Sequence, residues 1–232
     1  DITINGDMQA NGQNGSYSSG YMGGGGSGGT IYLIGGAITG SGTISADGGD
    51  GYGGYGGGGG GGRIALYYSS LSIDPNSITA TAGQLEDTPA EDGTIFSYNT
   101  ATGNVTVAND VSFGADQGIN RDGTTRTDGV YYFNDLTISN DSTVTIEGYW
   151  TDETDGRGVT INLDGDLRVE LGSTITATGQ GYSSDLGPGR GVWPGGLASG
   201  PGGGYGGVGG SANSATQGGG IYGENQKYYP YL

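Results

Sequence analysis

The chain of 232 residues contains no cysteine and no histidine. The absence of cysteine excludes disulfide bonds and thiolate metal ligands, and the absence of histidine excludes the usual zinc sites and any Ser-His or Cys-His nucleophile. Basic residues are scarce as well, because 7 Lys and Arg stand against 24 Asp and Glu, for a formal charge of −17. This charge opposes binding to anionic lipid and to nucleic acid, whose recognition depends on Lys and Arg at phosphates. Divalent cations are compatible partners.

Long apolar runs and helical patterns are also missing. No segment is apolar over the length that a bilayer requires, so we expect no membrane insertion. No window repeats apolar residues at helical spacing, and glycine opposes a helix by about 1 kcal/mol per residue. The chain does not begin with Met and shows no signal peptide. We therefore expect a mature or excised piece of a secreted protein, located outside the cell or on its surface.

Glycine is present in excess, at 57 residues, or about a quarter of the chain against a usual share of about 7%. Strand-like segments follow Gly29, Gly62, Gly93, Gly129 and Gly158, at steps of 33, 31, 36 and 29 residues. A repeat of roughly 32 residues is typical of stacked solenoids. Because the chain also has 17 Tyr and many β-branched residues, we expect ordered β structure. We interpret the glycine runs as polyglycine II-like extended helices packed side by side, with flexible linkers as the alternative.

A second motif places a large apolar residue two positions before an alanine, in residues 8–12, 44–48, 78–82 and 175–179. Alternation at period 2 puts both on one buried face. After Gly129 the apolar phase shifts by one residue, so we expect the outline of the coil to change there. The predicted core, stacked in ladders along the axis, consists of Ile31, Leu33, Ile44, Ala46, Ile64, Leu66, Ile78, Ala80, Ile95, Ile175 and Ala177.

These repeats predict an all-β fold, a parallel β-helix-like solenoid with glycine-rich loops, and a stacked β-sandwich is the alternative. We expect one rod over residues 1–232. Its glycine-rich parts are residues 1–68 and 172–232, and its acidic, less glycine-rich middle is residues 69–171. Residues 172–220 resemble the opening of a glycine-rich array, and residues 1–68 resemble the end of one. We therefore interpret the chain as one period of a longer repeating polypeptide.

Three phrases of the chain resemble the glycine-rich repeats of very large secreted or cell-surface proteins of bacteria and environmental microbes: GGGGSGGTIYLIGGAITGSGTISADGGDG, GGGGGGGRIALYY and ITATGQGYSSDLGPGRG. The likeness lies mostly in residues 23–68 and 172–222, and it does not extend to residues 84–155. The resemblance implies an extracellular, repetitive surface protein with a β-helical fold. It transfers no catalytic residues.

Acidic turns are the candidate metal sites. Asp47 and Asp50 flank a glycine pair, and Asp164 and Asp166 flank Gly165. Carboxylates and backbone carbonyls at such turns supply the oxygen ligands that calcium requires, so these four aspartates are candidate calcium ligands. None of them matches the EF-hand loop or the nonapeptide of calcium-binding β-rolls. The alternative interpretation is that Asp and Gly occur there because turns favour them.

Candidate residues for carbohydrate contact lie near a second acidic cluster. Residues 152–155, next to Arg157, are dense enough in carboxylates to suggest the paired acids of glycosidases, but nothing fixes their geometry and we predict no enzyme. The aromatic side chains of Tyr149, Trp150 and Trp193 are suited to stacking on a sugar. A polysaccharide-binding surface module is therefore the alternative function.

The ends of the chain predict self-association. A stacked rod exposes unpaired strand edges, and solitary repeat proteins protect them with polar or helical caps, which are absent at both ends of this sequence. We expect head-to-tail contact with an identical unit through Ile2, Ile4, Tyr228, Tyr229, Tyr231 and Leu232. The leading function is a structural segment of an extracellular fibre, sheath or surface adhesin.

A third interpretation is a flat ice- or mineral-binding face, suggested by the alternating Thr160, Thr174, Thr176 and Thr178.

Overall fold

The computed structural model of the chain is an all-β solenoid of stacked, mostly parallel strands, as the repeats predict. It describes residues 1–53, 55–84, 90–150, 156–182, 186–192, 201–204, 208–212 and 217–220. Within these residues the helical content is a single 3-10 turn, Pro75–Ser77, and no helix has the length and apolarity needed to cross a membrane. Contacts divide the chain into two units: residues 1–147 with 159–176, and residues 148–158 with 177–232.

The first stack of coils is built from the N-terminal strands of the first unit. Its first coil contains β1 (Ile2–Thr3), β2 (Asp7–Gln9) and β5 (Thr30–Ile34), its second contains β6 (Ala37–Thr39), β7 (Thr43–Ser45) and β8 (Arg63–Tyr68), and its third contains β9 (Ser70–Leu71), β10 (Ile78–Thr79) and β11 (Thr94–Asn99). Equivalent strands pair in parallel, so that Ile44 of β7 lies between Met8 and Ile78. A small hairpin of β3 (Tyr17–Ser18) and β4 (Tyr21–Met22) lies within the glycine-rich loop of the first coil.

The second stack begins where the chain reverses after β11. Its strands are β12 (Asn104–Ala108), β13 (Val111–Gly114), β14 (Gly118–Ile119), β15 (Thr125–Arg126), β16 (Val130–Phe133), β17 (Leu136–Ser139), β18 (Thr143–Glu147), β21 (Thr160–Leu163), β22 (Leu167–Val169) and β23 (Thr174–Thr176). Strand β12 pairs antiparallel with β11 and parallel with β17. In the second unit, β19 (Tyr149–Trp150) pairs antiparallel with β20 (Gly156–Arg157).

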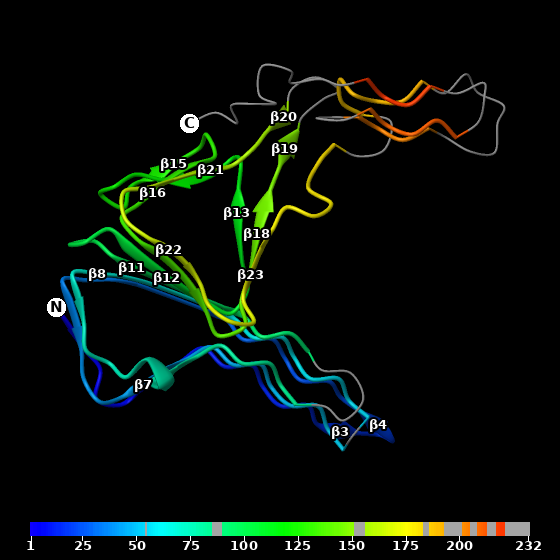
Figure 1. Cartoon of the computed structure of the whole chain (residues 1–232). Coiled ribbons are helices and arrows are strands. Elements are labelled where there is room, and N and C mark those ends of the chain that lie inside the picture. Colours follow the sequence, from blue (N-terminus) through cyan, green and yellow to red (C-terminus); the bar gives the residue numbers. More distant parts are fainter. Residues whose placement is uncertain are drawn as a thin grey trace. The chain divides into compact units, whose positions relative to one another are not determined.

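One six-stranded sheet, in the order β22-β17-β12-β11-β8-β5, belongs to both stacks. Successive side chains of a strand point to opposite faces of a sheet. In β11, Ile95 packs against the first hydrophobic core, whereas Phe96 and Tyr98 belong to the second. The two stacks therefore lie on opposite faces of the shared sheet, which Figure 1 shows on either side of β8, β11 and β12. This arrangement changes the outline of the coil, and the change begins at the turn between β11 and β12.

Most of the predicted core is buried: Ile31, Ile44, Ala46, Ile64, Leu66, Ile78 and Ala80. Leu33 and Ile95 are half-buried and pack against the first core, and half-buried Ile175 packs against the second. The prediction for Ala177 is wrong, because this residue follows the last strand of the second stack and is exposed.

The glycine-rich loops of the first stack are ordered as polyglycine II-like segments, which confirms the prediction. Consecutive N–H groups of residues 46–52 point in different directions with a period of three. Those of Gly48 and Gly51 donate to the outgoing segment of the next coil, at 2.8 and 3.4 Å. Those of Gly49 and Tyr52 donate to the returning segment of the previous coil, at 2.8 and 3.1 Å. Three residues per turn is the period of this extended helix.

Glycine is required in these segments because the backbones approach each other closely. A Cβ atom on Gly51 would lie 1.6 Å from the carbonyl oxygen of Gly56. The second unit repeats this packing: a Cβ on Gly218 would lie 1.7 Å from the carbonyl oxygen of Gly209, whose N–H donates to Gly219 at 2.9 Å. The glycine runs are therefore a packed structural element in both units.

Candidate functional sites

The aspartates at the first glycine-rich turns form a ladder of side-chain to backbone hydrogen bonds. The Oδ1 atom of Asn11 accepts the N–H of Asp47 at 2.8 Å, and the Oδ1 atom of Asp47 accepts the N–H of Thr81 at 2.8 Å. The same contact joins Asp50 to the N–H of Gln84, also at 2.8 Å. These side chains supply the third hydrogen-bond direction of the polyglycine II-like segments, and each one satisfies a backbone donor of the next coil.

At the second turn, the carboxylate of Asp164 has a partner, whereas for Asp166 the contact involves its backbone N–H. The carboxylate of Asp164 pairs with the guanidinium of Arg121, with Nη2 and Oδ1 2.9 Å apart, and the N–H of Asp166 donates to Asp135 at 2.8 Å. In the described part of the chain, no group of three or more acidic side chains is placed to hold a metal ion. Because calcium also takes backbone carbonyls as ligands, calcium binding at Asp47, Asp50, Asp164 and Asp166 stays a prediction.

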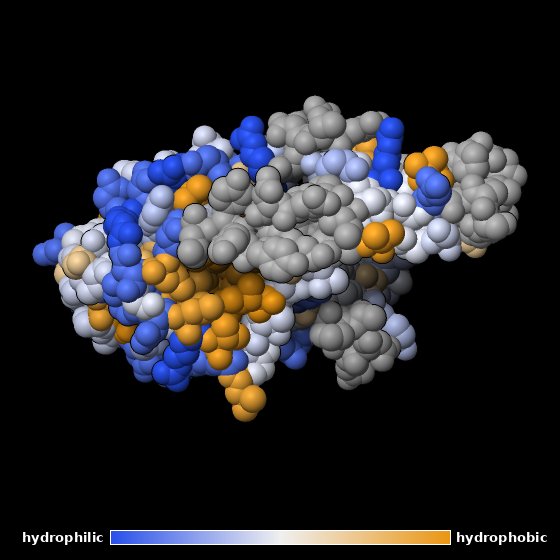
Figure 2. Space-filling view, turned by 45° about the horizontal axis from the view of Figure 1, so that its top comes forward, coloured by the Kyte–Doolittle hydropathy of each residue, from blue (hydrophilic) through white to orange (hydrophobic). Residues whose placement is uncertain are grey.

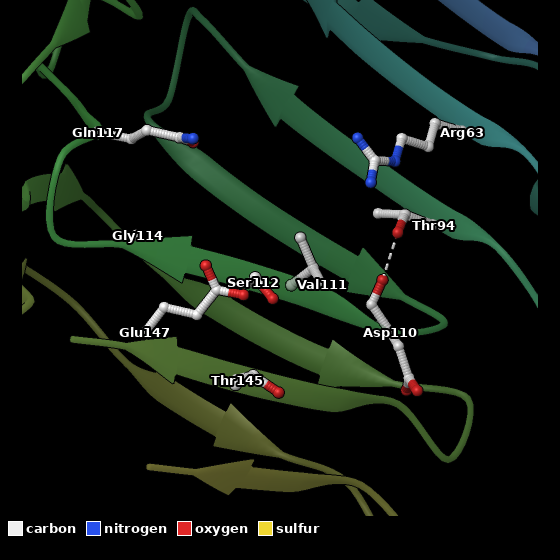
Figure 3. A pocket seen from close by; sticks show the side chains of 9 residues that line it. All are labelled: Arg63, Thr94, Asp110, Val111, Ser112, Gly114, Gln117, Thr145 and Glu147. Atoms are coloured by element: carbon white, nitrogen blue, oxygen red, sulfur yellow. Dashed lines mark hydrogen bonds between the residues drawn. The ribbon is translucent and has the colours of Figure 1, made fainter. Parts of the chain in front are cut away.

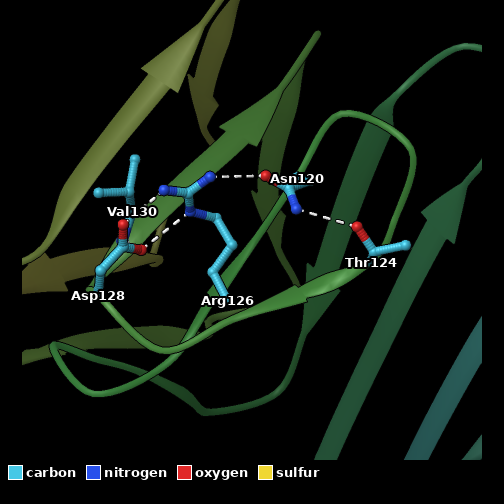
Figure 4. Close-up of polar contacts among 5 residues, drawn as sticks. All are labelled: Asn120, Thr124, Arg126, Asp128 and Val130. Carbon is cyan, nitrogen blue, oxygen red and sulfur yellow. Dashed lines mark hydrogen bonds and ion pairs between the residues drawn. The ribbon is translucent and has the colours of Figure 1, made fainter.

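A polar cluster fixes the hairpin of β14 and β15 to the neighbouring strands (Figure 4). Arg126 donates from Nε to Oδ1 of Asp128 at 2.9 Å and from Nη1 to Oδ1 of Asn120 at 2.7 Å. Asn120 in turn donates to the hydroxyl of Thr124 at 2.9 Å. The guanidinium also lies 5.6 Å from the ring centroid of Tyr132. Hydrogen bonding to Arg126 lowers the pKa of the Asp128 carboxyl. Because its members pair with one another, this cluster has a structural role and holds the hairpin of β14 and β15 in place.

A polar hollow of about 400 Å³ lies beside β13 and β18 (Figure 3). Its lining consists of Arg63, Thr94, Asp110, Val111, Ser112, Gly114, Gln117, Thr145 and Glu147. The outward side chains of the paired residues Ser112 and Thr145 bring two hydroxyls together. Asp110 is held by its neighbours, because its Oδ1 accepts the N–H of Thr143 at 2.6 Å and its carbonyl accepts the hydroxyl of Thr94. The hollow therefore combines hydroxyl, amide, carboxylate and guanidinium groups.

The remaining predicted binding residues are scattered. Tyr149 is partly exposed in β19, and the side chain of Trp150 and the whole of Trp193 lie outside the described residues, as does the acidic cluster at 152–155. The alternating threonines do not lie in one sheet, because Thr160 in β21 pairs with Val130 of β16, whereas Thr174 and Thr176 in β23 pair with β18.

The predicted assembly residues fall into two groups. Ile4 is buried in the first core and Ile2 is half-buried opposite Ile38, so Ile4 has no exposed side chain to offer a neighbouring copy. Tyr228, Tyr229, Tyr231 and Leu232 lie outside the described residues.

Sequence reasoning missed an apolar surface at the last coil of the second stack. Leu167 and Val169 are 52% and 42% exposed and Leu171 is 99% exposed. Figure 2 shows hydrophobic side chains gathered in one area of the face that it presents. The signal was available, since apolar residues alternate with Arg168 and Glu170 as they do in a half-buried strand. No known protein family, curated protein or solved structure matches the chain.

Proposed function

We propose that the chain is a structural unit of an extracellular fibre, sheath or surface adhesin, and that it assembles end to end with identical units. The supporting observation is the uncovered end of the second stack. Leu136 and Ile138 of β17 are fully buried, but Leu167 and Val169, their register partners in β22, are about half exposed. Full burial of such a side chain contributes roughly 1.5–3 kcal/mol, and about half of this is unrealised at each residue. A further β layer over β22 would recover it.

Two other positions at the ends of the stacks are covered within the chain. The hairpin of β14 and β15 covers Tyr98, whose hydroxyl donates to the carbonyl of Arg121 at 2.8 Å. At the last outgoing glycine-rich segment of the first stack, the N–H of Ala82 donates to Oδ1 of Asp92 at 2.7 Å, where earlier coils donate to the next coil. Because the protein caps these positions, the apolar end at β22 is consistent with a surface that meets a partner.

Sedimentation velocity and electron microscopy of the full chain over a wide concentration range test this proposal. We expect end-to-end oligomers, and we expect the double variant Leu167→Asn with Val169→Asn to shift them to monomers. The matched control is Arg168→Asn, which changes a side chain on the opposite face of the same strand and should leave assembly unchanged. A wild-type chain that sediments as a monomer at every concentration would contradict the proposal.

The polar hollow supports a second candidate function, binding of an uncharged polysaccharide. Its hydroxyl, amide and carboxylate groups are of the kinds that pair with sugar hydroxyls. Titration calorimetry with neutral polysaccharides should detect binding that is weakened by Glu147→Ala and unchanged by Glu170→Ala, a substitution outside the hollow. Equal affinity in both variants would show that the hollow is not the binding site.

A further inference from the structure

We propose that neighbouring copies join through the two edges of the shared six-stranded sheet, with β22 of one copy pairing antiparallel with β5 of the next. This inference rests on the proposed end-to-end assembly and specifies its contact surface. Within the described residues, each of these two strands has one sheet neighbour and leaves its other edge unpaired. An unpaired strand edge is a template for pairing with another chain.

Two rows of apolar side chains cross the sheet from one edge to the other on the same face. Register pairing places the first row at Tyr32, Ala65, Phe96, Val107, Ile138 and Val169. It places the second row at Ile34, Tyr67, Tyr98, Val105, Leu136 and Leu167. Cross-strand neighbours of this kind are the units that stabilise a sheet.

Both rows are buried in the middle and exposed at both ends. On β11, β12 and β17 their members are at most 8% exposed. On the outer strands, Tyr32 and Ile34 are 58% and 66% exposed at one edge, and Val169 and Leu167 are 42% and 52% exposed at the other. Each row therefore ends in an uncovered apolar side chain at each edge of the sheet.

The opposite face of the same sheet provides an internal comparison. Among the described residues, the first core on this face includes side chains of β5, β8 and β11 but none of β12, β17 and β22, and one row at these three strands is polar: Thr106, Thr137 and Arg168. On the face with the two apolar rows, Tyr67 of β8 packs at the margin of the second core, whereas Tyr32 and Ile34 of β5 are exposed in the described part of the chain. The exposed row on the first-core face is thus polar, whereas the exposed side chains on the second-core face, at β5 and β22, are apolar. This is the pattern expected if a partner covers the apolar side chains.

Strand direction and register agree with this junction. Strands β5, β8 and β11 are parallel, β12 is antiparallel to β11, and β17 and β22 are parallel to β12. A second copy in the same orientation therefore presents its β5 antiparallel to β22, the relation that β11 and β12 already have. Continuation of the two rows sets Val169 opposite Tyr32 of the next copy and Leu167 opposite Ile34. The side chains covering β22 are then those of a second copy.

Disulfide trapping tests the junction, because the chain has no cysteine of its own. Opposite residues of an antiparallel pair have Cα atoms about 4.5–5.5 Å apart, a distance that a disulfide spans. The double variant Tyr32→Cys with Val169→Cys should form a ladder of covalent oligomers on mild oxidation. Within one copy these residues are about 24 Å apart, five strand spacings, so no internal disulfide competes.

The matched control is Tyr32→Cys with Leu167→Cys, which shifts one cysteine by two residues at similar exposure. It should form the ladder several-fold more slowly, and far-ultraviolet circular dichroism would confirm that both variants are folded. A faster ladder from the shifted pair would overturn the register. Filaments in electron micrographs without a ladder from either pair would overturn this junction and leave the proposed function standing. The absence of both filaments and ladder would overturn both.

Discussion

Replacement of Gly59 by alanine is expected to destabilise the protein strongly, whereas the same change at Gly57 is not. A Cβ on Gly59 would lie 2.0 Å from the carbonyl oxygen of Gly26, and real Cβ contacts are essentially never below 3.0 Å, so the two segments must separate by about 1 Å. A Cβ on Gly57 would meet no atom within 4 Å, and this glycine does not have a positive φ.

The expected loss follows from the contacts that must move. Separation weakens the hydrogen bond from the Gly59 N–H to Gly49, 2.9 Å, and the one from the Gly83 N–H to Gly59, 2.8 Å. Each contributes about 0.5–1.5 kcal/mol, and overpacking adds about 1–3 kcal/mol. Gly59→Ala should thus lower the free energy of unfolding by about 2–6 kcal/mol. Gly57→Ala should raise it by about 0.4–1 kcal/mol, because alanine restricts the unfolded chain.

Thermal unfolding followed by circular dichroism measures both variants. For a chain of this length each kcal/mol shifts the melting temperature by about 2–4 °C, so Gly59→Ala should melt about 4–24 °C below the wild type. A Gly59→Ala variant that melts at or above the wild-type temperature would contradict the close backbone contact at Gly59. So would a Gly57→Ala variant that loses as much stability as Gly59→Ala does.

Three further predictions concern charged and phenolic side chains. Asp47→Ala should cost about 1.5–3 kcal/mol of stability because it removes the acceptor for the Thr81 N–H, and Asp47→Asn should cost less. If Asp47 acts as this acceptor and not as a calcium ligand, excess chelator should leave the melting temperature unchanged, and a fall on chelation would support the calcium interpretation. Hydrogen bonding to Arg126 lowers the pKa of Asp128, so the stability from this pair is present above the ordinary carboxyl pKa and lost as the pH falls through the lowered one. In Asp128→Asn, the free energy of unfolding should therefore fall less steeply as the pH is lowered. Burial, followed by the charges of neighbouring tyrosines, raises the pKa of Tyr67 from 10.0 to about 12. The stability that the protonated phenol contributes is therefore complete below pH 10.0 and lost as the pH rises through about 12. An equal fall in the free energy of unfolding at alkaline pH in Tyr67→Phe would contradict this.

The sequence predicts much of the first stack because its signals are local. Ile44 and Ala46 alternate with polar residues, and their burial follows from the period of a strand. The polyglycine II-like segments were also predictable, since long glycine runs interrupted by tyrosine recur at the same place in the repeat.

The second stack and the role of the acidic turns depend on contacts that are distant in sequence. Asp47 has the same local sequence whether it binds calcium or accepts a backbone N–H, and the difference depends on Thr81, 34 residues away. The reversal at β12 is likewise invisible locally, because Val105 and Val107 alternate as they would in a parallel strand. The exposure of Leu167 depends on which strands pair with β22, and within the described residues β17 alone does so.

Helical reconstruction of assembled material by electron cryomicroscopy tests whether copies join through β22 and β5. If the six-stranded sheet continues from copy to copy, each copy advances the filament by six strand spacings, or about 29 Å. We expect this rise, with density for β22 beside β5 of the next copy and Val169 opposite Tyr32. A filament with solvated edges at β22 and β5 and a rise unrelated to six strands would contradict it.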